Sequence, residues 1–399
     1  MNNRVNKNYK KYKKQTQRVR GGLLRSEHGE TSEAMFMNSG YTFKNAEEAR
    51  DRFAGELDGY LYSRYGNPTV AMFEERLALN EGAESCFATA SGMAAVFASL
   101  MSYLKSGDEV VSSRALFGSC YHILDQILPR YNITTHLIDG TDLSQWEKHI
   151  TKKTKCIFLE SPSNPTMEIV DIQSVANIAH HYNALLIVDN ILASPILQKP
   201  LELGADIVVY SATKHIDGQG RTMGGAILSS KQHYEECIKP FMRHTGPTLS
   251  PFNAWILLKG LETLQYRIDQ HCQNAKKVAN FLSQHSKVEK TIYPGLENHP
   301  QYHLAKIQML QPGSIVTFVI KGNNAFQFIN ALNLFDISNN FGDVKSLVTH
   351  PATTTHRVIG EEGRKILNIS DNMIRLSIGL EDVEDLIEDI DQAFQQINI

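Results

Sequence analysis

The stretch Ile207-Val-Val-Tyr-Ser-Ala-Thr-Lys214 joins a short apolar run to a lysine, and a glycine-rich segment follows it as far as Gly225. The apolar, β-branched run predicts a buried strand. Burial at the end of such a strand disfavours the ammonium form of Lys214 and favours the neutral, nucleophilic amine. An amine of this kind forms a Schiff base with a carbonyl cofactor, and the hydroxyls of Ser211 and Thr213 are suited to bind a phosphate. Taken alone, the pattern is equally typical of a surface lysine after a strand.

The preceding apolar run, Ala184-Leu-Leu-Ile-Val-Asp189, ends at a carboxylate. Ligands of an open parallel sheet bind beyond the carboxyl ends of its strands, so Asp189 and Lys214 are expected in one crevice. Pyridoxal 5′-phosphate needs such a pair, a lysine for its aldehyde and a carboxylate for its ring nitrogen. A third signal is Thr89-Ala-Ser-Gly92-Met93, which opens an apolar helical run whose first N–H groups are suited to phosphate. Together these signals predict a pyridoxal-phosphate site with the Schiff base at Lys214.

Apolar runs and helical patterns alternate from Ser85 to Lys214, and this rhythm predicts a mostly parallel sheet covered by helices. A long helical stretch from Phe252 to about His285 is expected to connect this α/β domain to a smaller C-terminal α/β domain. The expected division is an N-terminal arm, a large cofactor-binding domain and a small domain that includes the connector helix, at residues 1–62, 63–255 and 256–399.

The composition limits the possible functions. The chain has 399 residues, of which 42% are hydrophobic and 21% charged, as in ordinary soluble globular proteins. A net charge of −3 gives no general attraction for nucleic acid. No apolar run is long enough to span a membrane, and the N-terminus lacks the apolar core of a signal peptide. The five cysteines are scattered without Cys-x-x-Cys spacing, which favours a reduced, cytoplasmic setting without a structural metal.

Two further features suggest functions that we do not expect. Residues 1–20 are rich in Lys and Arg and contain no Asp or Glu, which would suit a nucleic-acid or membrane arm. They show no apolar periodicity, and we expect a solvated, poorly ordered tail instead. His299 and His303 have metal-like i, i+4 spacing but no third ligand nearby, so we expect both at the surface.

From about Thr16 to the C-terminus the sequence closely resembles the cysteine/methionine-metabolism family of pyridoxal-phosphate enzymes. Seven blocks in the same order carry the resemblance, and they are Tyr62-Ser-Arg64, Ser91-Gly-Met93, Ser161-Pro-Ser-Asn164-Pro, Val188-Asp189-Asn190, Ser211-Ala-Thr-Lys214, His350-Pro-Ala and Arg375-Leu-Ser-Ile-Gly-Leu-Glu. The resemblance implies the transferase fold of type I for these enzymes, with a large, mostly parallel sheet domain.

The resemblance also implies roles for single residues. Lys214 would hold the cofactor and shuttle protons, Asp189 would pair with the ring nitrogen, Asn164 would lie near the phenolic oxygen, and Phe117 would stack on the ring. The phosphate would be bound by Gly92, Met93, Ser211 and Thr213, and from a neighbouring subunit by Tyr62 and Arg64. Tyr62 would join Lys214 as a catalytic residue, and the substrate would be bound by Arg375, Ser346 and Asn164. Shared sites imply a homotetramer built from active dimers.

Within the family, Lys214–Arg221 and Gly342–Leu347 look most like the bacterial O-succinylhomoserine sulfhydrylases. This subgroup would use O-succinylhomoserine and sulfide to make homocysteine in methionine biosynthesis. Phe117 stands where many members have a tyrosine, Ser119 where methionine γ-lyases usually have a cysteine, and Lys345 where many cystathionine-converting members have a glutamate. Three alternatives stay open: cystathionine γ-synthase, O-acetylhomoserine sulfhydrylase, and methionine or cystathionine γ-lyase. A non-catalytic binding protein is disfavoured, because the lysine, carboxylate and arginine are all present.

Overall fold

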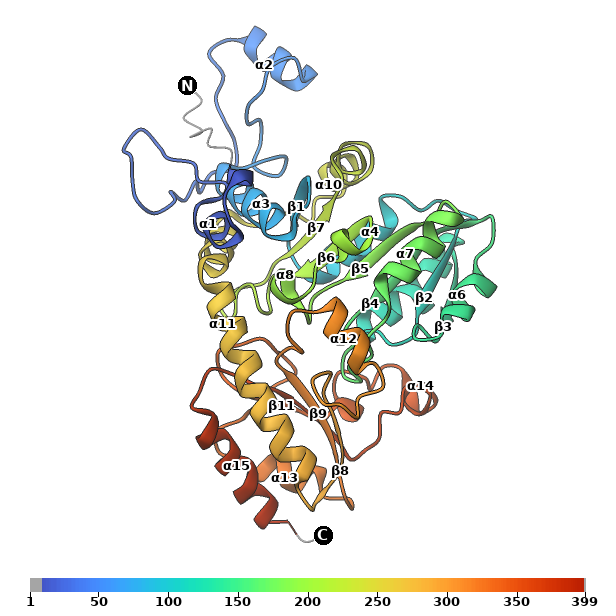
Figure 1. Ribbon diagram of the computed structural model, residues 1–399. Helices are drawn as coiled ribbons and strands as arrows, with labels where there is room; N and C mark the ends of the chain where they lie inside the picture. Colours follow the sequence, from blue (N-terminus) through green and yellow to red (C-terminus); the bar gives the residue numbers. More distant parts are fainter. Residues whose placement is uncertain (1–8, 398–399) are drawn as a thin grey trace.

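Two sheets organise the chain, which the computed structural model in Figure 1 describes over residues 9–397. The larger sheet has seven strands in the order β1-β7-β6-β5-β4-β2-β3. Strands β3, β2, β4, β5 and β6 run parallel, and β7 is antiparallel to both of its neighbours. The prediction of a mostly parallel sheet is confirmed. The bounds are β1 Ser85–Thr89, β2 Glu109–Ser113, β3 Thr134–Ile138, β4 Thr154–Glu160, β5 Leu185–Asp189, β6 Ile207–Ser211 and β7 Gly225–Ser229.

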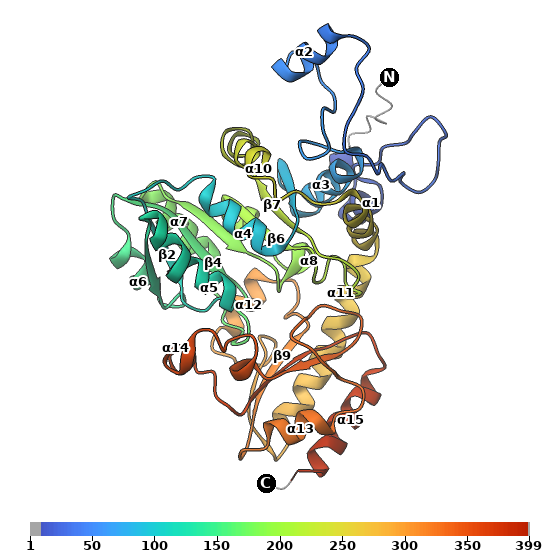
Figure 2. The same ribbon diagram turned by 180° about the vertical axis from the view of Figure 1, so that it is seen from behind.

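Helices cover both faces of this sheet because its strands are apolar on both sides. Along β4, Ile157 and Leu159 point into one core while Cys156 and Phe158 point into the other. The first core is closed by α3 (Pro68–Glu81), α7 (Ile172–His181) and the start of α11 (Pro251–Gln284). The second is closed by α4 (Gly92–Met101), α5 (Gly118–His122) and α10 (Lys239–Thr245), of which α4 and α5 are seen best from behind (Figure 2). Shorter helices are α6 (Leu143–His149), α8 (Ser194–Leu197) and α9 (Lys231–His233).

The predicted connector is the 34-residue helix α11, which runs from the large sheet to the small one (Figure 1). The small sheet has the order β10-β11-β12-β9-β8 and packs one face on α11, α13 and α15. Its elements are β8 Val288–Ile292, β9 Ile315–Ile320, α13 Ala325–Ala331, β10 Asp336–Ile337, β11 Leu347–Thr349, α14 Gly360–Ile366, β12 Met373–Ser377 and α15 Val383–Gln395. Helix α12 (Tyr302–Gln308) departs from this arrangement, because Ala305 and Met309 pack into the core of the large domain.

The prediction of a poorly ordered tail is wrong for residues 9–20. They form a short 3₁₀ turn at Tyr9–Lys11 and helix α1 (Lys14–Arg20). The amide of Gln17 is buried and donates hydrogen bonds to backbone carbonyls of the preceding turn, and Arg18 Nε donates to Asn80 Oδ1 at 2.8 Å. These internal bonds fix the segment although it has no apolar stripe. The part of the expectation that concerns residues 1–8 lies outside the described residues.

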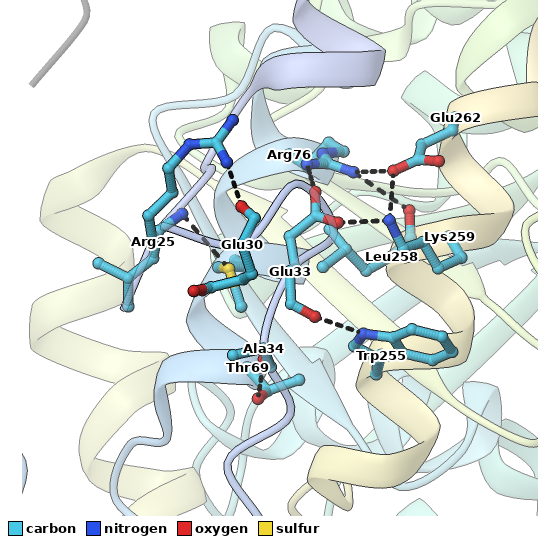
Figure 3. Close-up of polar contacts among 12 residues, drawn as sticks. Arg25, Glu30, Glu33, Ala34, Thr69, Arg76, Trp255, Leu258, Lys259 and Glu262 are labelled. Carbon is cyan, nitrogen blue, oxygen red and sulfur yellow. Dashed lines mark hydrogen bonds and ion pairs between the residues drawn. The ribbon is translucent and has the colours of Figure 1, made fainter. Parts of the chain in front are cut away.

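The rest of the N-terminal arm is anchored by a buried charged network (Figure 3). Glu33 of the arm pairs with Arg76 of α3 and with Lys259 of α11. Glu262 completes the network at 3.2 Å from Arg76 and 3.0 Å from Lys259, while Trp255 Nε1 donates to the Glu33 carbonyl at 2.8 Å. Beyond this anchor the chain leads into α2 (Ala46–Ala54), which projects away from both sheets (Figure 1).

Candidate active site

A pocket of about 870 Å³, its open mouth included, lies at the carboxyl ends of β4, β5 and β6. The start of α4 and a loop of the small domain close its sides. Eight of the residues singled out in the sequence line it, namely Gly92, Met93, Phe117, Asn164, Asp189, Ser211, Thr213 and Lys214. The parallel strands bring these residues together because they end at one edge of the sheet. The geometric prediction that Asp189 and Lys214 share a crevice is therefore met by the structure.

Lys214 extends into this pocket from the turn that follows β6. Its amine donates a hydrogen bond to Asn340 Oδ1 and lies 5.0 Å from the centre of the Phe341 ring. Burial, followed by the charge of Arg375, lowers the pKa of the amine to about 8. A substantial neutral fraction is thus present near physiological pH, as attack on a carbonyl requires.

Asp189 is a buried carboxylate at the end of β5, and among residues 9–397 it forms no ion pair. Its one hydrogen bond there comes from the backbone N–H of Ile191 at 3.2 Å. Burial raises the pKa of this carboxyl to about 7. A buried carboxylate without a cation is costly unless a ligand supplies the positive charge.

The start of α4 is shaped to receive an anion. Ser91 caps the helix by accepting from the N–H of Ala94 at 3.2 Å, and Ser91, Gly92 and Met93 line the pocket. Gly92 lies so close to β6 that a Cβ there would fall 2.4 Å from the Cβ of Ser211. Only glycine therefore allows this approach of helix and strand, which a phosphate could bridge through the hydroxyls of Ser211 and Thr213.

Arg375 comes from β12 of the small sheet and is fully buried beside the pocket. Its Nη1 donates to Asn164 Oδ1 at 3.0 Å, and its Nη2 donates to the carbonyls of Asn339 and Asn340 at 3.1 and 2.8 Å. Burial lowers the pKa of the guanidinium to about 10, and Nε has no hydrogen-bond partner within residues 9–397. All three partners are neutral oxygens, so the charge of Arg375 is left for a carboxylate ligand.

Ser346 does not occupy the place expected for it. Its hydroxyl donates to Glu381 Oε2 and accepts from the N–H of Gly379, both at 2.9 Å, and it does not line the pocket. Lys345 is exposed, so its identity cannot influence the pocket directly. The positions beside Arg375 and Lys214 are taken instead by Asn339 and Asn340, which precede Ser346 in the same loop.

Sequence reasoning missed several residues at the pocket walls or just behind them. The walls include Glu160, Cys120, Asn339 and Phe341, and Asn340 contacts Lys214 from just behind them. Glu160 carried a signal, because it directly follows the apolar run Cys156-Ile-Phe-Leu159, in the same way as Asp189 ends its own apolar run. The other residues carried none, since a loop asparagine, a loop phenylalanine and a helical cysteine are common in any sequence.

Tyr62 and Arg64 do not line this pocket. The side chain of Arg64 donates to the backbone carbonyl of Arg243, and its guanidinium carbon lies 5.6 Å from the centre of the Tyr62 ring. Tyr62 is 43% exposed. Within one chain, these two residues are therefore not brought to the start of α4.

The expectation for the two histidines is wrong in one case. His303 is exposed, but His299 is buried, and burial lowers its pKa to about 4. Over the described part of the chain, no group of three or more His, Cys, Asp or Glu side chains could hold a metal ion.

Pyridoxal phosphate fits the groups present. Its protonated ring nitrogen would be the cationic partner that Asp189 lacks. Its aldehyde suits the amine of Lys214, and its phosphate suits the start of α4. The fold and the pocket together thus define a pyridoxal-phosphate enzyme. More particularly, the chain belongs to the family described as Cys/Met metabolism PLP-dependent enzyme, whose model matches residues 15–395.

Several individual proteins of known name or structure are similar to this chain over nearly its whole length. The O-succinylhomoserine sulfhydrylase of Mycobacterium tuberculosis (strain H37Rv) is 53% identical over 381 residues, which are 94% of each chain. The L-methionine gamma-lyase of Fusobacterium nucleatum subsp. polymorphum is 38% identical over 97% of this chain and 99% of its own. A Campylobacter jejuni protein, solved with N′-pyridoxyl-lysine-5′-monophosphate, superposes with a TM-score of 0.93 at 34% identity and covers 96% of this chain and 100% of its own. The family thus links its cofactor through a lysine, and its members differ in activity.

Proposed function

We propose that this enzyme makes homocysteine from O-succinylhomoserine and sulfide in methionine biosynthesis. In this reaction the bond between Cγ and the ester oxygen breaks, a Cγ–S bond forms, and succinate leaves. The observation that carries the proposal is the 53% identity, over nearly the whole chain, to a relative named for this activity. When bound, the cofactor supplies an electron-withdrawing ring that acidifies the substrate's Cα and Cβ protons.

Lys214 is the proposed acid–base group at Cα and Cβ. It is the one lysine lining the described pocket, and its lowered pKa matches the requirement that a proton carrier titrate near the working pH. Asn340 accepts a hydrogen bond from its amine and so limits where the amine can lie.

Arg375 is the proposed clamp for the α-carboxylate of the substrate. A carboxylate would replace the two backbone carbonyls on Nη2 and could also reach the unpartnered Nε. Such an exchange of neutral for charged acceptors strengthens the hydrogen bonds. The bond from Nη1 to Asn164 would keep the guanidinium in plane during the exchange.

We propose that no side chain of this pocket wall takes the place of sulfide in the reaction at Cγ. Phe117 can stack on a ring but cannot transfer a proton, and Ser119 lies in the neighbouring groove rather than in the pocket. Burial raises the pKa of the Cys120 thiol well above its usual range, so this side chain stays a neutral thiol and does not compete with sulfide.

Product analysis tests the proposal. Purified enzyme is supplied with succinyl- or acetylhomoserine, each with sulfide or cysteine, and kcat/KM is compared. We expect the highest kcat/KM for succinylhomoserine with sulfide. A preference for cysteine would indicate a cystathionine γ-synthase, and a preference for the acetyl ester would indicate an O-acetylhomoserine sulfhydrylase. Release of 2-oxobutyrate and a thiol from methionine would instead indicate the γ-lyase activity of the Fusobacterium relative.

We also propose that each pocket is completed by Tyr62 and Arg64 of a second copy of the chain, in a homotetramer of active dimers. Both residues lie outside the pocket of their own chain, and Tyr62 is 43% exposed. An open apolar groove of about 880 Å³ adjoins the pocket, and Met93 lines both. A second copy seated there would reach the phosphate end of the pocket.

Mixed oligomers test this arrangement. Arg64→Ala and Lys214→Ala protomers are each inactive in the shared-site scheme, whereas a mixture regains about a quarter of the wild-type sites when subunits exchange at random. Native mass spectrometry verifies the exchange. Exchanged but wholly inactive mixtures would rule out shared sites.

A further inference from the structure

Glu160 is a second buried carboxyl in the pocket, and the roles proposed above do not use it. It ends β4, and its Cα pairs in register with that of Asp189 at the end of β5. Neighbouring strands lie about 4.8 Å apart, and residues in register point to the same face. Both carboxyls are therefore side by side beneath the cofactor site, and neither has a cationic partner within residues 9–397.

The two oxygens of Glu160 are already engaged. Oε2 accepts from the N–H of Phe117 at 2.8 Å, and Oε1 accepts from the N–H of Asn164 at 2.9 Å. Phe117 is the N-cap residue of α5 and lies on one wall of the pocket. Asn164 lies in the loop after β4 and contacts Arg375. One carboxyl group thus connects the ring-stacking residue to the residue that orients the substrate clamp.

The two carboxyls differ in what they face. Asp189 is left free for the ring nitrogen of the cofactor, which would supply a cationic partner, whereas both oxygens of Glu160 are held by backbone N–H groups. Burial and the charge of Asp189 raise the pKa of Glu160, and the two N–H groups act in the opposite direction because they stabilise the ionised form.

We propose that Glu160 is a positioning residue that holds Phe117 at the start of α5 and the Asn164 loop in place through its two hydrogen bonds, and leaves the ring nitrogen of the cofactor to Asp189. The inference requires the family's cofactor at Asp189, but not a particular acyl group or thiol. Its failure is therefore distinguishable from failure of the proposed substrate.

The positioning role is tested by visible circular dichroism of the bound cofactor and by the ratio of KM to kcat. Glu160→Ala loses both hydrogen bonds, and we expect a reduced cofactor signal and a kcat/KM lower by roughly 5- to 150-fold. Glu160→Gln keeps one acceptor but turns its NH2 group towards the second backbone N–H, so it should recover only part of both. Asp189→Asn should lose cofactor affinity, which Glu160→Gln should retain. If Glu160→Gln lost cofactor affinity as Asp189→Asn does, Glu160 would be a charge partner of the ring and the proposal would fall.

Discussion

Two clusters of buried charge in this protein differ in whether each charge meets an opposite charge. In the anchor of the N-terminal arm, Arg76 and Lys259 are matched by Glu33 and Glu262, each within reach of an opposite charge (Figure 3). Burial alone would raise the pKa of Glu33, yet the charge of Arg76 and the hydrogen bonds of Lys259 and Arg76 hold it below its usual value. This cluster is complete without a ligand.

In the pocket, charges of both signs are buried without meeting. Asp189 has no cation within the described chain, while Lys214 and Arg375 are bound to neutral oxygens. Buried unpaired charge destabilises a fold, so it is retained where a ligand supplies the missing partner. In these two clusters, the paired charges anchor the arm and the unpaired charges lie at the pocket. Substitutions in the anchor should therefore mainly lower stability, and substitutions in the pocket should mainly lower activity or binding.

The largest expected effect is that of Lys214→Ala. The variant loses the amine that is proposed to link the cofactor and carry protons, so turnover should fall by more than the ~10²–10⁴-fold typical of general acid–base catalysis. The visible absorbance of the linked cofactor should disappear as well. Lys199→Met is a suitable control, because burial also lowers the pKa of that lysine to about 8 outside the pocket. A coloured, active Lys214→Ala enzyme would refute the assignment.

Arg76→Met should mainly affect stability. The change leaves Glu33 and Glu262 without their shared partner, and loss of one member of a buried ion pair typically costs about 3–5 kcal/mol. Urea unfolding of the holoenzyme measures the loss. Lys365→Ala, in an exposed pair with Glu361, should leave the midpoint nearly unchanged. Equal effects of the two changes would show that the buried network does not anchor the arm.

Arg375→Lys should affect substrate binding while the cofactor stays bound. Lysine keeps the charge but cannot bond a carboxylate in a bidentate way, so about 1.5–3 kcal/mol of binding is lost, or roughly 10- to 150-fold in KM. Steady-state kinetics and the cofactor spectrum measure the two effects separately. The exposed Arg130→Lys serves as control. A bleached enzyme with unchanged KM would contradict the clamp role.

The smallest expected effect is on the pH dependence of stability, measured as the melting temperature of the cofactor-free enzyme across a pH series. The pKa of Asp189 is about 7 in the folded protein, against an ordinary value of 3.8. Between these values the folded state binds more protons than the unfolded state, so stability falls as pH rises from about 4 to 7. Asp189→Asn removes this loss, and its melting temperature should exceed that of the wild type above pH 7 but not near pH 4. A constant difference across the series would show that Asp189 does not titrate in this window.

Much of the pocket was predictable because its residues follow local signals. The apolar runs that end at Asp189 and Lys214 both form strands of the large sheet, β5 and β6, and the glycine of Ser91-Gly-Met93 begins a helix. The connector helix also lies within one residue of its predicted bounds. The burial of His299 was not predictable, because it depends on how the segment after β8 folds back onto the body of the protein.

The sequence by itself determined the parallel sheet and the two strand ends that carry Asp189 and Lys214, because periodicity and chain order act over a few residues and fix which edge each strand end reaches. Only the tertiary structure decided that Asn339 and Asn340, rather than Ser346, meet Arg375 and Lys214. It also decided that Glu160 joins two loops beneath the cofactor site. Those contacts join segments about 40 to 210 positions apart in the chain. They depend on the packing of one domain or loop against another, which no local pattern of residues records.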